Sequence, residues 1–507
     1  MTRTATHVAL AGIDLDRRSS VPLSIQIYEG LRRAILRGQL RSGTRLPSTR
    51  SLAEEYEVSR NTTVFAYEQL LDEGYVEAKI GSGTCVARSL PDELLSVGAA
   101  VTDAGYRPSS RRTVSPRGKL LSVFRRRWPP DQNPIRPLTI PHPPRPFDSG
   151  LPDTGVFPFK IWSQLLAKHW RRPGHGLLTH GDPAGFSPLR EAIAEYLRTA
   201  RAVQCEVDQI FVINGSQQGL DLTARLLVDS GDAALLEDPG YPGARAALEA
   251  TGARLIRLPV DTQGANIHGI KEPVSNVRLI FVTPSHQFPL GVTMNVARRL
   301  ALLDRANRSR AWILEDDYDS EYRYRGRPLP SLQGLDRTGR VIYMGSFSKT
   351  LFPSLRLGFL VLPRDLVESF RHARSITDGH SPITEQAVLA DFIAEGHFAR
   401  HIRRMRALYQ ERQLVLIEAI RQELSGLLEV QPSDGGMHVV GWLPKGVRDV
   451  VASQRAAACG VFVRPLSSCS IGKLTREGLL LGYAALNRNQ IREGVQKLAV
   501  ALQPRAK

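Results

Sequence analysis

The chain of 507 residues is 42% hydrophobic and 23% charged, the composition of an ordinary soluble protein with several domains. No apolar run reaches the roughly 18 residues that a membrane span needs, and the first residues lack the apolar core of a signal peptide, so we expect a cytoplasmic protein with no membrane partner. Four cysteines without CxxC spacing argue against a disulfide framework or a metal site. The formal net charge of +17 favours a polyanionic partner.

Residues 21–89 have the element order of a winged helix-turn-helix. Apolar residues at helical spacing predict a first helix beginning at Pro22, and a short second helix and a third over residues 60–73 follow it. Two short runs, 74–78 and 84–86, predict a β-hairpin. The buried side of the third helix is predicted to consist of Val64, Tyr67 and Leu71.

In such a unit the third helix enters the major groove of DNA through its N-terminal residues. Arg60 can form paired hydrogen bonds with guanine and Asn61 with adenine, while Ser59 and Thr63 can bind phosphates. A three-helix head with a hairpin can also mediate protein contacts, so the element order alone leaves that alternative open. Residues 1–103 hold 12 basic and 13 acidic residues, which predicts modest DNA affinity for one copy of this unit.

Residues 90–147 interrupt the periodic pattern and predict a basic linker. Between residues 104 and 147 there are ten prolines and ten Lys and Arg residues against one acid, Asp131. Proline at this density prevents a continuous helix and favours a semi-rigid, extended spacer. The positive charge can contribute to DNA binding, or the segment can be a spacer alone.

From residue 148 to 507, strand and helix signals alternate, which predicts an α/β domain with a largely parallel sheet covered on both faces. A strand at 209–213 turns through Asn214 and Gly215 into a helix. A helix N-terminus with small residues can bind phosphate, so Ser216 and Gln217 are candidate phosphate ligands. This turn taken alone is a weak signal.

Lys349 is the most informative single residue of this domain. It follows a predicted buried strand, 341–344, together with Ser346 and Ser348, and Arg356 lies seven positions later. A lone lysine after a strand is usually a solvated loop residue. In this setting it suits a Schiff base with pyridoxal 5′-phosphate, because the hydroxyls and the guanidinium can hold the phosphate of that cofactor.

A second segment supports the same chemistry. Residues 311–319 form an apolar run that ends in acidic residues, at the carboxyl end of a strand where open α/β sheets bind ligands. A carboxylate at that place can pair with the pyridinium nitrogen of the cofactor. Tyr318 can donate a hydrogen bond to the ring hydroxyl.

The motifs Glu315-Asp316-Asp317-Tyr318-Asp319-Ser320-Glu321 and Gly345-Ser346-Phe347-Ser348-Lys349 resemble those of the MocR regulators, a branch of the GntR family. The resemblance covers nearly the whole chain. It implies a multidomain protein with an α-rich winged helix-turn-helix and an α/β domain of the fold-type I aminotransferases. It also implies that Lys349 is the Schiff-base lysine, Asp316 the pyridinium partner and Tyr318 the ring-hydroxyl partner.

Further roles are implied by the same resemblance. Tyr241 would stack on the pyridine ring, and His286 or Gln287 would bind the ring hydroxyl. Arg476 would bind the carboxylate of an effector, while Gly243 stands where some members carry a second arginine. Sequence similarity of residues 46–75 to the GntR-type head implies that the DNA contacts include Arg50, Arg60, Thr62 and Gly81. A metal role for His286 has no supporting spacing.

These features predict a transcription regulator that senses pyridoxal phosphate itself, an amine or an amino acid. By resemblance the aminotransferase-like domains form a head-to-tail homodimer, so the double-stranded DNA operator is expected to contain repeated half-sites. The alternative is a working aminotransferase that carries an accessory DNA-binding head. Steady-state turnover would separate the two.

Overall fold

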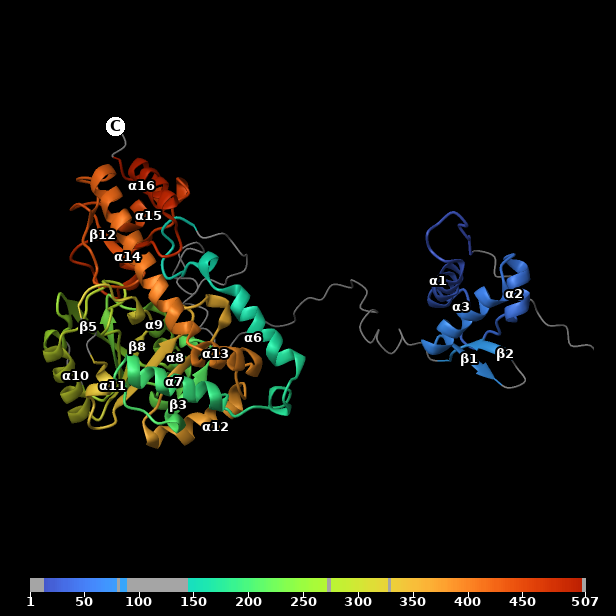
Figure 1. Cartoon of the computed structure of the whole chain (residues 1–507), viewed down its shortest axis with the longest axis horizontal. Helices are drawn as coiled ribbons and strands as arrows, with labels where there is room; N and C mark the ends of the chain where they lie inside the picture. The colour runs from blue at the N-terminus through green and yellow to red at the C-terminus, as the bar shows by residue number, and fades with distance from the viewer. Residues whose placement is uncertain (1–12, 80–82, 89–144, 271–274, 327–329, 504–507) are drawn as a thin grey trace, which may run out of the picture. The chain divides into compact units, whose positions relative to one another are not determined.

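The computed structural model describes residues 13–79, 83–88, 145–270, 275–326 and 330–503. The chain divides into two compact units, Met1–Thr113 and Val114–Lys507. Helices and strands of each unit are labelled in Figure 1. Most of the predicted linker lies outside the described residues. Phe147, which the sequence assigned to the end of the linker, is fully buried in the core of the second unit.

The described part of the first unit, residues 13–79 and 83–88, contains three helices and a hairpin, as the sequence predicts. The helices are α1 (Leu23–Leu36), α2 (Thr49–Glu55) and α3 (Arg60–Asp72). Strands β1 (Val76–Lys79) and β2 (Gly83–Val86) pair antiparallel. The side chains of Ser48 and Ser59 cap α2 and α3 by accepting hydrogen bonds from backbone N–H groups three residues later.

The buried face of α3 differs from the prediction. Tyr67 is buried as expected, but Leu71 is 43% exposed and Leu70 takes the core position. Ala66 is also fully buried. The reason is that α3 packs against both α1 and α2, which rotates its buried face toward the residues that lie between the two helices.

The second unit is built on an eight-stranded sheet with the order β3-β10-β9-β8-β7-β4-β5-β6. Its central pairs, from β9 through β8, β7 and β4 to β5, are parallel, whereas β10 pairs antiparallel with β9 and β3, and β6 with β5. The sheet is therefore mixed: its centre is parallel, as the sequence predicts, and its two edges are antiparallel. The strands are β3 (Ile210–Ile213), β4 (Ala233–Asp238), β5 (Arg254–Asp261), β6 (Gly264–Ala265), β7 (Val277–Val282), β8 (Trp312–Asp317), β9 (Val341–Ser346) and β10 (Gly358–Val361).

Helices cover both faces of this sheet. Leu314 of β8 belongs to one apolar cluster and its neighbour Ile313 to another, because successive side chains of a strand point to opposite faces. The covering helices are α6 (Phe159–Arg171), α7 (Ser187–Ala200), α8 (Ser216–Leu227), α9 (Pro242–Thr251), α10 (Val296–Ser309), α11 (Leu332–Leu335), α12 (Val367–Thr377) and α13 (Ile383–Ala394).

The C-terminal part of the second unit is a small antiparallel sheet with the order β11-β12-β14-β13. The long helix α14 (His397–Glu423) leads into it, and α15 (Asp449–Ala458) and α16 (Arg488–Leu502) pack beside it. Its strands are β11 (Glu429–Val430), β12 (His438–Trp442), β13 (Arg464–Pro465) and β14 (Gly478–Gly482). None of the helices in the described ranges combines the length and the apolar character of a membrane span.

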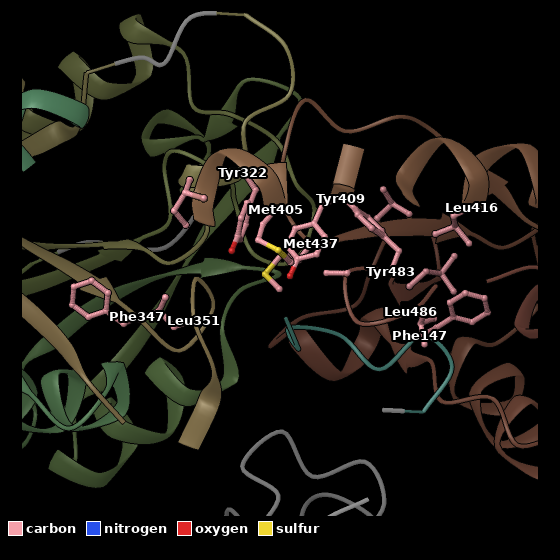
Figure 2. Close-up of a cluster of buried hydrophobic side chains, with 14 of the residues drawn as sticks. Phe147, Tyr322, Phe347, Leu351, Met405, Tyr409, Leu416, Met437, Tyr483 and Leu486 are labelled. Atoms are coloured by element: carbon pink, nitrogen blue, oxygen red, sulfur yellow. The ribbon is translucent and has the colours of Figure 1, made fainter. Parts of the chain in front are cut away.

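One apolar cluster runs through both parts of this unit. Figure 2 shows Tyr322, Met405, Tyr409 and Met437 gathered between the two parts. Phe347 and Leu351, which flank Lys349, belong to the same cluster and are almost fully buried. The backbone on either side of Lys349 is therefore fixed by core packing.

Candidate functional site

Lys349 projects into a cavity of about 200 Å³, which we call the Lys349 cavity. Its Nζ donates a hydrogen bond to the backbone oxygen of Gly150 at 2.7 Å. Burial lowers the pKa of the Lys349 amine, which favours the neutral, nucleophilic form. Glycine is favoured at position 150 because its φ is +82°, and a Cβ there would lie 2.8 Å from Nζ. The walls are formed by Ser149, Gly150, Ser216, Tyr241, Thr283, Phe288, Asp316, Tyr318, Asp319, Lys349, Met437, His438 and Arg464.

Asp316 stands at the carboxyl end of β8, beside β9, which leads to Lys349. It is 5% exposed, and its Oδ1 has no hydrogen-bond partner in the described part of the chain. Burial, reinforced by Asp317 and Asp319, raises the pKa of Asp316 to about 8. A buried carboxyl without a partner fits a cationic N–H group, such as a pyridinium nitrogen, that enters the cavity.

The N-terminus of α8 and Arg356 form a cradle that could hold a phosphate. Gly215 caps the helix with φ +82°, and Ser216 at its first position lines the cavity. Arg356 has φ +53° and donates through Nη2 to the backbone oxygen of Asn214 at 2.8 Å. A Cβ at position 215 would lie 3.2 Å from the guanidinium carbon of Arg356. Backbone N–H groups and a guanidinium thus meet at one place.

Arg356 and the remaining predicted phosphate ligands, Gln217, Ser346 and Ser348, are not among the residues that line the cavity. The Ser346 hydroxyl accepts a hydrogen bond from the Ser348 backbone N–H at 3.2 Å. The side chain of Gln217 donates to the backbone oxygen of Gly243 at 3.1 Å. Gln217 therefore links the starts of α8 and α9.

Tyr318 lines the cavity, and His286, which does not line it, contacts the Tyr318 hydroxyl. His286 Nδ1 lies 3.0 Å from the Tyr318 hydroxyl and 3.1 Å from Asp319 Oδ1. Gln287 behaves differently from the prediction: it is 1% exposed and its amide donates to the backbone oxygens of Pro239 and Phe288. Its amide holds the surrounding loops together, and it is not among the residues that line the cavity.

Tyr241 also lines the cavity. Its ring meets that of Phe288 edge to face, with 5.7 Å between ring centroids. Burial raises the pKa of its hydroxyl, which stays protonated. A flat ring entering the cavity would have aromatic surfaces available for stacking.

Arg476 does not reach the Lys349 cavity, in contrast to the expectation. Its Nη2 pairs with Glu429 Oε2 at 2.7 Å, its side chain is 45% exposed, and it lines a separate surface groove with Trp442. The arginine that does line the Lys349 cavity is Arg464 of β13. Among the described residues, no carboxylate forms an ion pair with Arg464, so its guanidinium can bind an anion.

The start of α3 presents two of the predicted DNA contacts. Arg60 and Asn61 are exposed, and Thr62 is half-buried. Arg50 is exposed at the start of α2, where it pairs with Glu54. Thr63 differs from the expectation of a phosphate contact: it is fully buried, and its hydroxyl donates to the backbone oxygens of Thr49 and Arg60.

Ser59 and Gly81 complete the predicted DNA contacts. The Ser59 hydroxyl accepts a hydrogen bond from the backbone N–H of Thr62, so it caps α3, although the residue remains exposed. Gly81 lies outside the described residues.

Sequence reasoning missed several cavity residues. The most consequential are Arg464, His438, Thr283 and Asp319. Asp319 directly follows Tyr318 within the quoted motif, so its position was a usable signal. Arg464 and His438 come from the small sheet, more than eighty residues after Lys349, and only tertiary folding brings them to the cavity.

Comparison with known proteins gives independent matches to both units. Residues 23–86 match the model of bacterial regulatory proteins of the gntR family, and residues 151–498 match aminotransferase class I and II. The probable rhizopine catabolism regulatory protein MocR of Rhizobium meliloti is 44% identical over 96% of this chain and 95% of its own length. The pyridoxine biosynthesis regulator PdxR of Corynebacterium glutamicum is 30% identical over 95% and 97%.

Solved structures match the second unit. The α-aminoadipate aminotransferase LysN of Thermus thermophilus superposes with a TM-score of 0.65 at 30% identity, covering 70% of this chain and 91% of that one. Kynurenine aminotransferase of Pyrococcus horikoshii gives a TM-score of 0.65 at 27% identity, covering 77% and 95%.

A winged helix-turn-helix of the GntR type joined to a fold-type I aminotransferase domain defines a class of DNA-binding transcription regulators that bind pyridoxal 5′-phosphate. Both matches occur in this one chain, and the regulators similar to it match over nearly their whole length. The chain belongs to the MocR branch of the GntR family.

Proposed function

We propose that this chain is a regulator whose DNA binding responds to pyridoxal phosphate, an amine or an amino acid bound in the Lys349 cavity. The observation that carries the proposal is the placement of Lys349 in one cavity with Asp316, whose carboxyl is buried and unpartnered among the described residues. A DNA-binding regulator of this family would act in the cytoplasm, where bacterial DNA is held.

In this proposal each cavity residue has a role toward the cofactor. The cofactor supplies an aldehyde and an electron-withdrawing ring. Lys349 would supply its amine to the aldehyde, and Asp316 would pair with the ring nitrogen. The start of α8, Arg356 and the nearby Ser346 and Ser348 would hold the phosphate. Tyr318, positioned by His286, would donate to the ring hydroxyl, and Tyr241 would cover a ring face.

Arg464 would select effectors that carry an anionic group. It lines the same cavity as Lys349 and has no acidic partner among the described residues. A guanidinium binds a carboxylate through two parallel hydrogen bonds, so an amino acid in this cavity could direct its amine toward the cofactor and its carboxylate toward Arg464. The exposed Arg476, already paired with Glu429, would not take this role.

DNA recognition in this proposal uses the start of α3. Arg60 and Asn61 read base edges, while Arg50, Ser59 and Thr62 contact the backbone. Two heads in a head-to-tail homodimer would bind repeated half-sites. Occupancy of the Lys349 cavity would change the position of the small sheet, which supplies Arg464 and His438 to the cavity wall.

The second candidate function is transamination with the head as an accessory. It is favoured by the presence of Lys349, Asp316 and Tyr318 in one cavity, and by the 2-aminoadipate transaminase of Thermus thermophilus, which is 30% identical over 70% of this chain. The decisive experiment pairs operator binding with turnover. Effector-dependent DNA affinity, together with turnover far below the roughly 10 per second of typical enzymes, supports the regulator. Turnover at that rate with DNA affinity indifferent to every amine and amino acid supports the enzyme.

A further inference from the structure

A second hollow, distinct from the Lys349 cavity, lies beside the start of α14. Its volume is about 310 Å³. It is enclosed by the end of α7, the short helical turn at Ser320–Tyr322 and the first turns of α14. Neither Lys349 nor Asp316 lines it. Its polar wall is formed by Arg201, Ser320, Glu321, Arg323, Arg403 and Arg406. We call it the arginine-lined hollow.

The positive charge of this hollow is largely uncompensated. Arg201 is neutralised, because it forms a buried ion pair with Asp317. Arg406 donates from Nε to the backbone oxygen of Glu321 at 2.9 Å, and Arg323 donates from Nη1 to the Thr293 hydroxyl at 3.3 Å. Both acceptors are neutral. Within the described ranges, no ion pair to a carboxylate involves Arg323, Arg403 or Arg406.

Three buried polar atoms on the same wall have no hydrogen-bond partner within the described residues. They are Ser320 Oγ, Glu321 Oε2 and Arg323 Nε. The other carboxyl oxygen of Glu321 accepts from the Tyr196 hydroxyl at 2.9 Å. Burial raises the pKa of Glu321, which favours the protonated carboxyl. All three groups can then donate a hydrogen bond, and an acceptor-rich ligand would satisfy them together.

A bound water molecule would not satisfy all three of these polar atoms. Ser320 and Arg323 also border a much smaller hollow of about 20 Å³, which has room for about one water molecule. Glu321 does not border that smaller hollow. The larger volume, three unneutralised guanidinium groups and an apolar wall that includes Phe398 and Ile402 are the properties of a site for a small organic acid.

We propose that the arginine-lined hollow binds a small organic anion that carries a phosphate or a carboxylate group, as a second ligand separate from the occupant of the Lys349 cavity. Arg403 and Arg406 would bind the anionic group at the mouth. Ser320, Glu321 and Arg323 would donate to its oxygens at the floor.

Isothermal titration of the full-length, cofactor-saturated protein tests this, with inorganic phosphate and succinate as probes. The double variant Arg403→Gln/Arg406→Gln should lose at least about tenfold in affinity for whichever probe binds, since it loses charge-assisted hydrogen bonds. The control is Arg421→Gln, an exposed arginine near the other end of α14, which should leave the affinity unchanged. Phosphate binding alone would indicate a phosphate ester as ligand, and succinate binding alone a carboxylic acid.

Arg356→Gln separates this site from the cradle at α8. Binding that is lost in Arg356→Gln but retained in the double variant would place the anion at the cradle and overturn the proposal. Equal affinity in the wild type and the double variant, or no binding of either probe to the wild type, would also overturn it. The substituted arginines are exposed, so the double variant should keep the circular dichroism and the melting temperature of the wild type.

Discussion

The hydroxyl of Tyr318 and Nδ1 of His286 lie 3.0 Å apart, and through this contact a residue of the Lys349 cavity is joined to the small C-terminal sheet. His286 Nε2 lies 3.3 Å from the hydroxyl of Ser433, in the loop that precedes β12. Gly436 in the same loop has φ +85°, and a Cβ there would lie 2.0 Å from the imidazole of His286. The imidazole therefore fills the space between the ends of the large-sheet strands and the small sheet.

Replacing Lys349 by alanine should abolish covalent attachment of the cofactor. The amine that Gly150 orients is removed, while the cradle at α8 remains. Purified Lys349→Ala should lack the visible cofactor absorbance, and borohydride reduction with peptide mapping should find no adduct in it. An adduct on another side chain of cofactor-saturated wild-type protein would contradict the assignment.

Asp316→Asn should stabilise the cofactor-free protein at alkaline pH. Burial raises the pKa of Asp316 from 3.8 to about 8, so its contribution to stability is full below pH 3.8 and is lost as pH rises toward 8. The amide never ionises. The free energy of unfolding of Asp316→Asn should exceed that of the wild type by on the order of 5 kcal/mol at pH 8.5 and by about half as much at pH 6, as thermal melts at the two pH values measure.

The same substitution should weaken cofactor binding, because the ring nitrogen loses its anionic partner. Spectral titration should give an affinity lower by at least about tenfold. A stability difference that does not change between pH 6 and pH 8.5, or an unchanged affinity, would contradict the role given to Asp316.

Arg464→Gln and Arg476→Gln form a matched pair. Arg464 lines the Lys349 cavity, whereas Arg476 lies in another groove and pairs with Glu429. Arg464→Gln should weaken amino-acid effectors by about tenfold or more and leave simple amines nearly unaffected. Arg476→Gln should change neither. Spectral titration with alanine and with ethylamine measures both, and the reverse result would restore the assignment made from the sequence.

Arg60→Ala should abolish operator binding and leave the cofactor spectrum intact, because Arg60 is exposed at the start of α3 and belongs to the unit that does not hold the Lys349 cavity. Gel-shift titration at fixed salt provides the measurement. Glu68→Ala, an exposed change in the middle of the same helix, serves as the control. Undiminished operator binding by Arg60→Ala would show that Arg60 does not contact the major groove of DNA.

The sequence predicted those features that depend on local pattern. The elements of the first unit, the strand before Lys349 and the acidic end of β8 follow from periodicity and capping residues, and the structure contains each of them. The bounds of α3 were predicted to within one residue, but its buried face was not. Neighbouring helices select which of Leu70 and Leu71 becomes core, and no residue within α3 reveals that choice.

The candidate site was predictable where its residues stand in recognisable motifs at the ends of strands. Asp316, Tyr318 and Lys349 lie at strand ends, and strand order brings them together. Arg476 was predicted to bind the effector carboxylate because it precedes a strand at the position where the family resemblance implies an arginine. The pairing of β13 with β14, which places Arg464 at the cavity instead, is a long-range contact that spacing does not encode.

Helix α14 has a mechanical consequence. Its 27 residues form one uninterrupted rod about 40 Å long. Phe398 near one end packs on Phe347, two residues before Lys349, while the far end packs against β11 and α16. A rod held in this way acts as a lever: a pivot of about 5° at the Phe398 end would carry its tip by roughly 3–4 Å. A small displacement near Lys349 would thus produce a larger displacement at the other end of α14, beside β11 and α16.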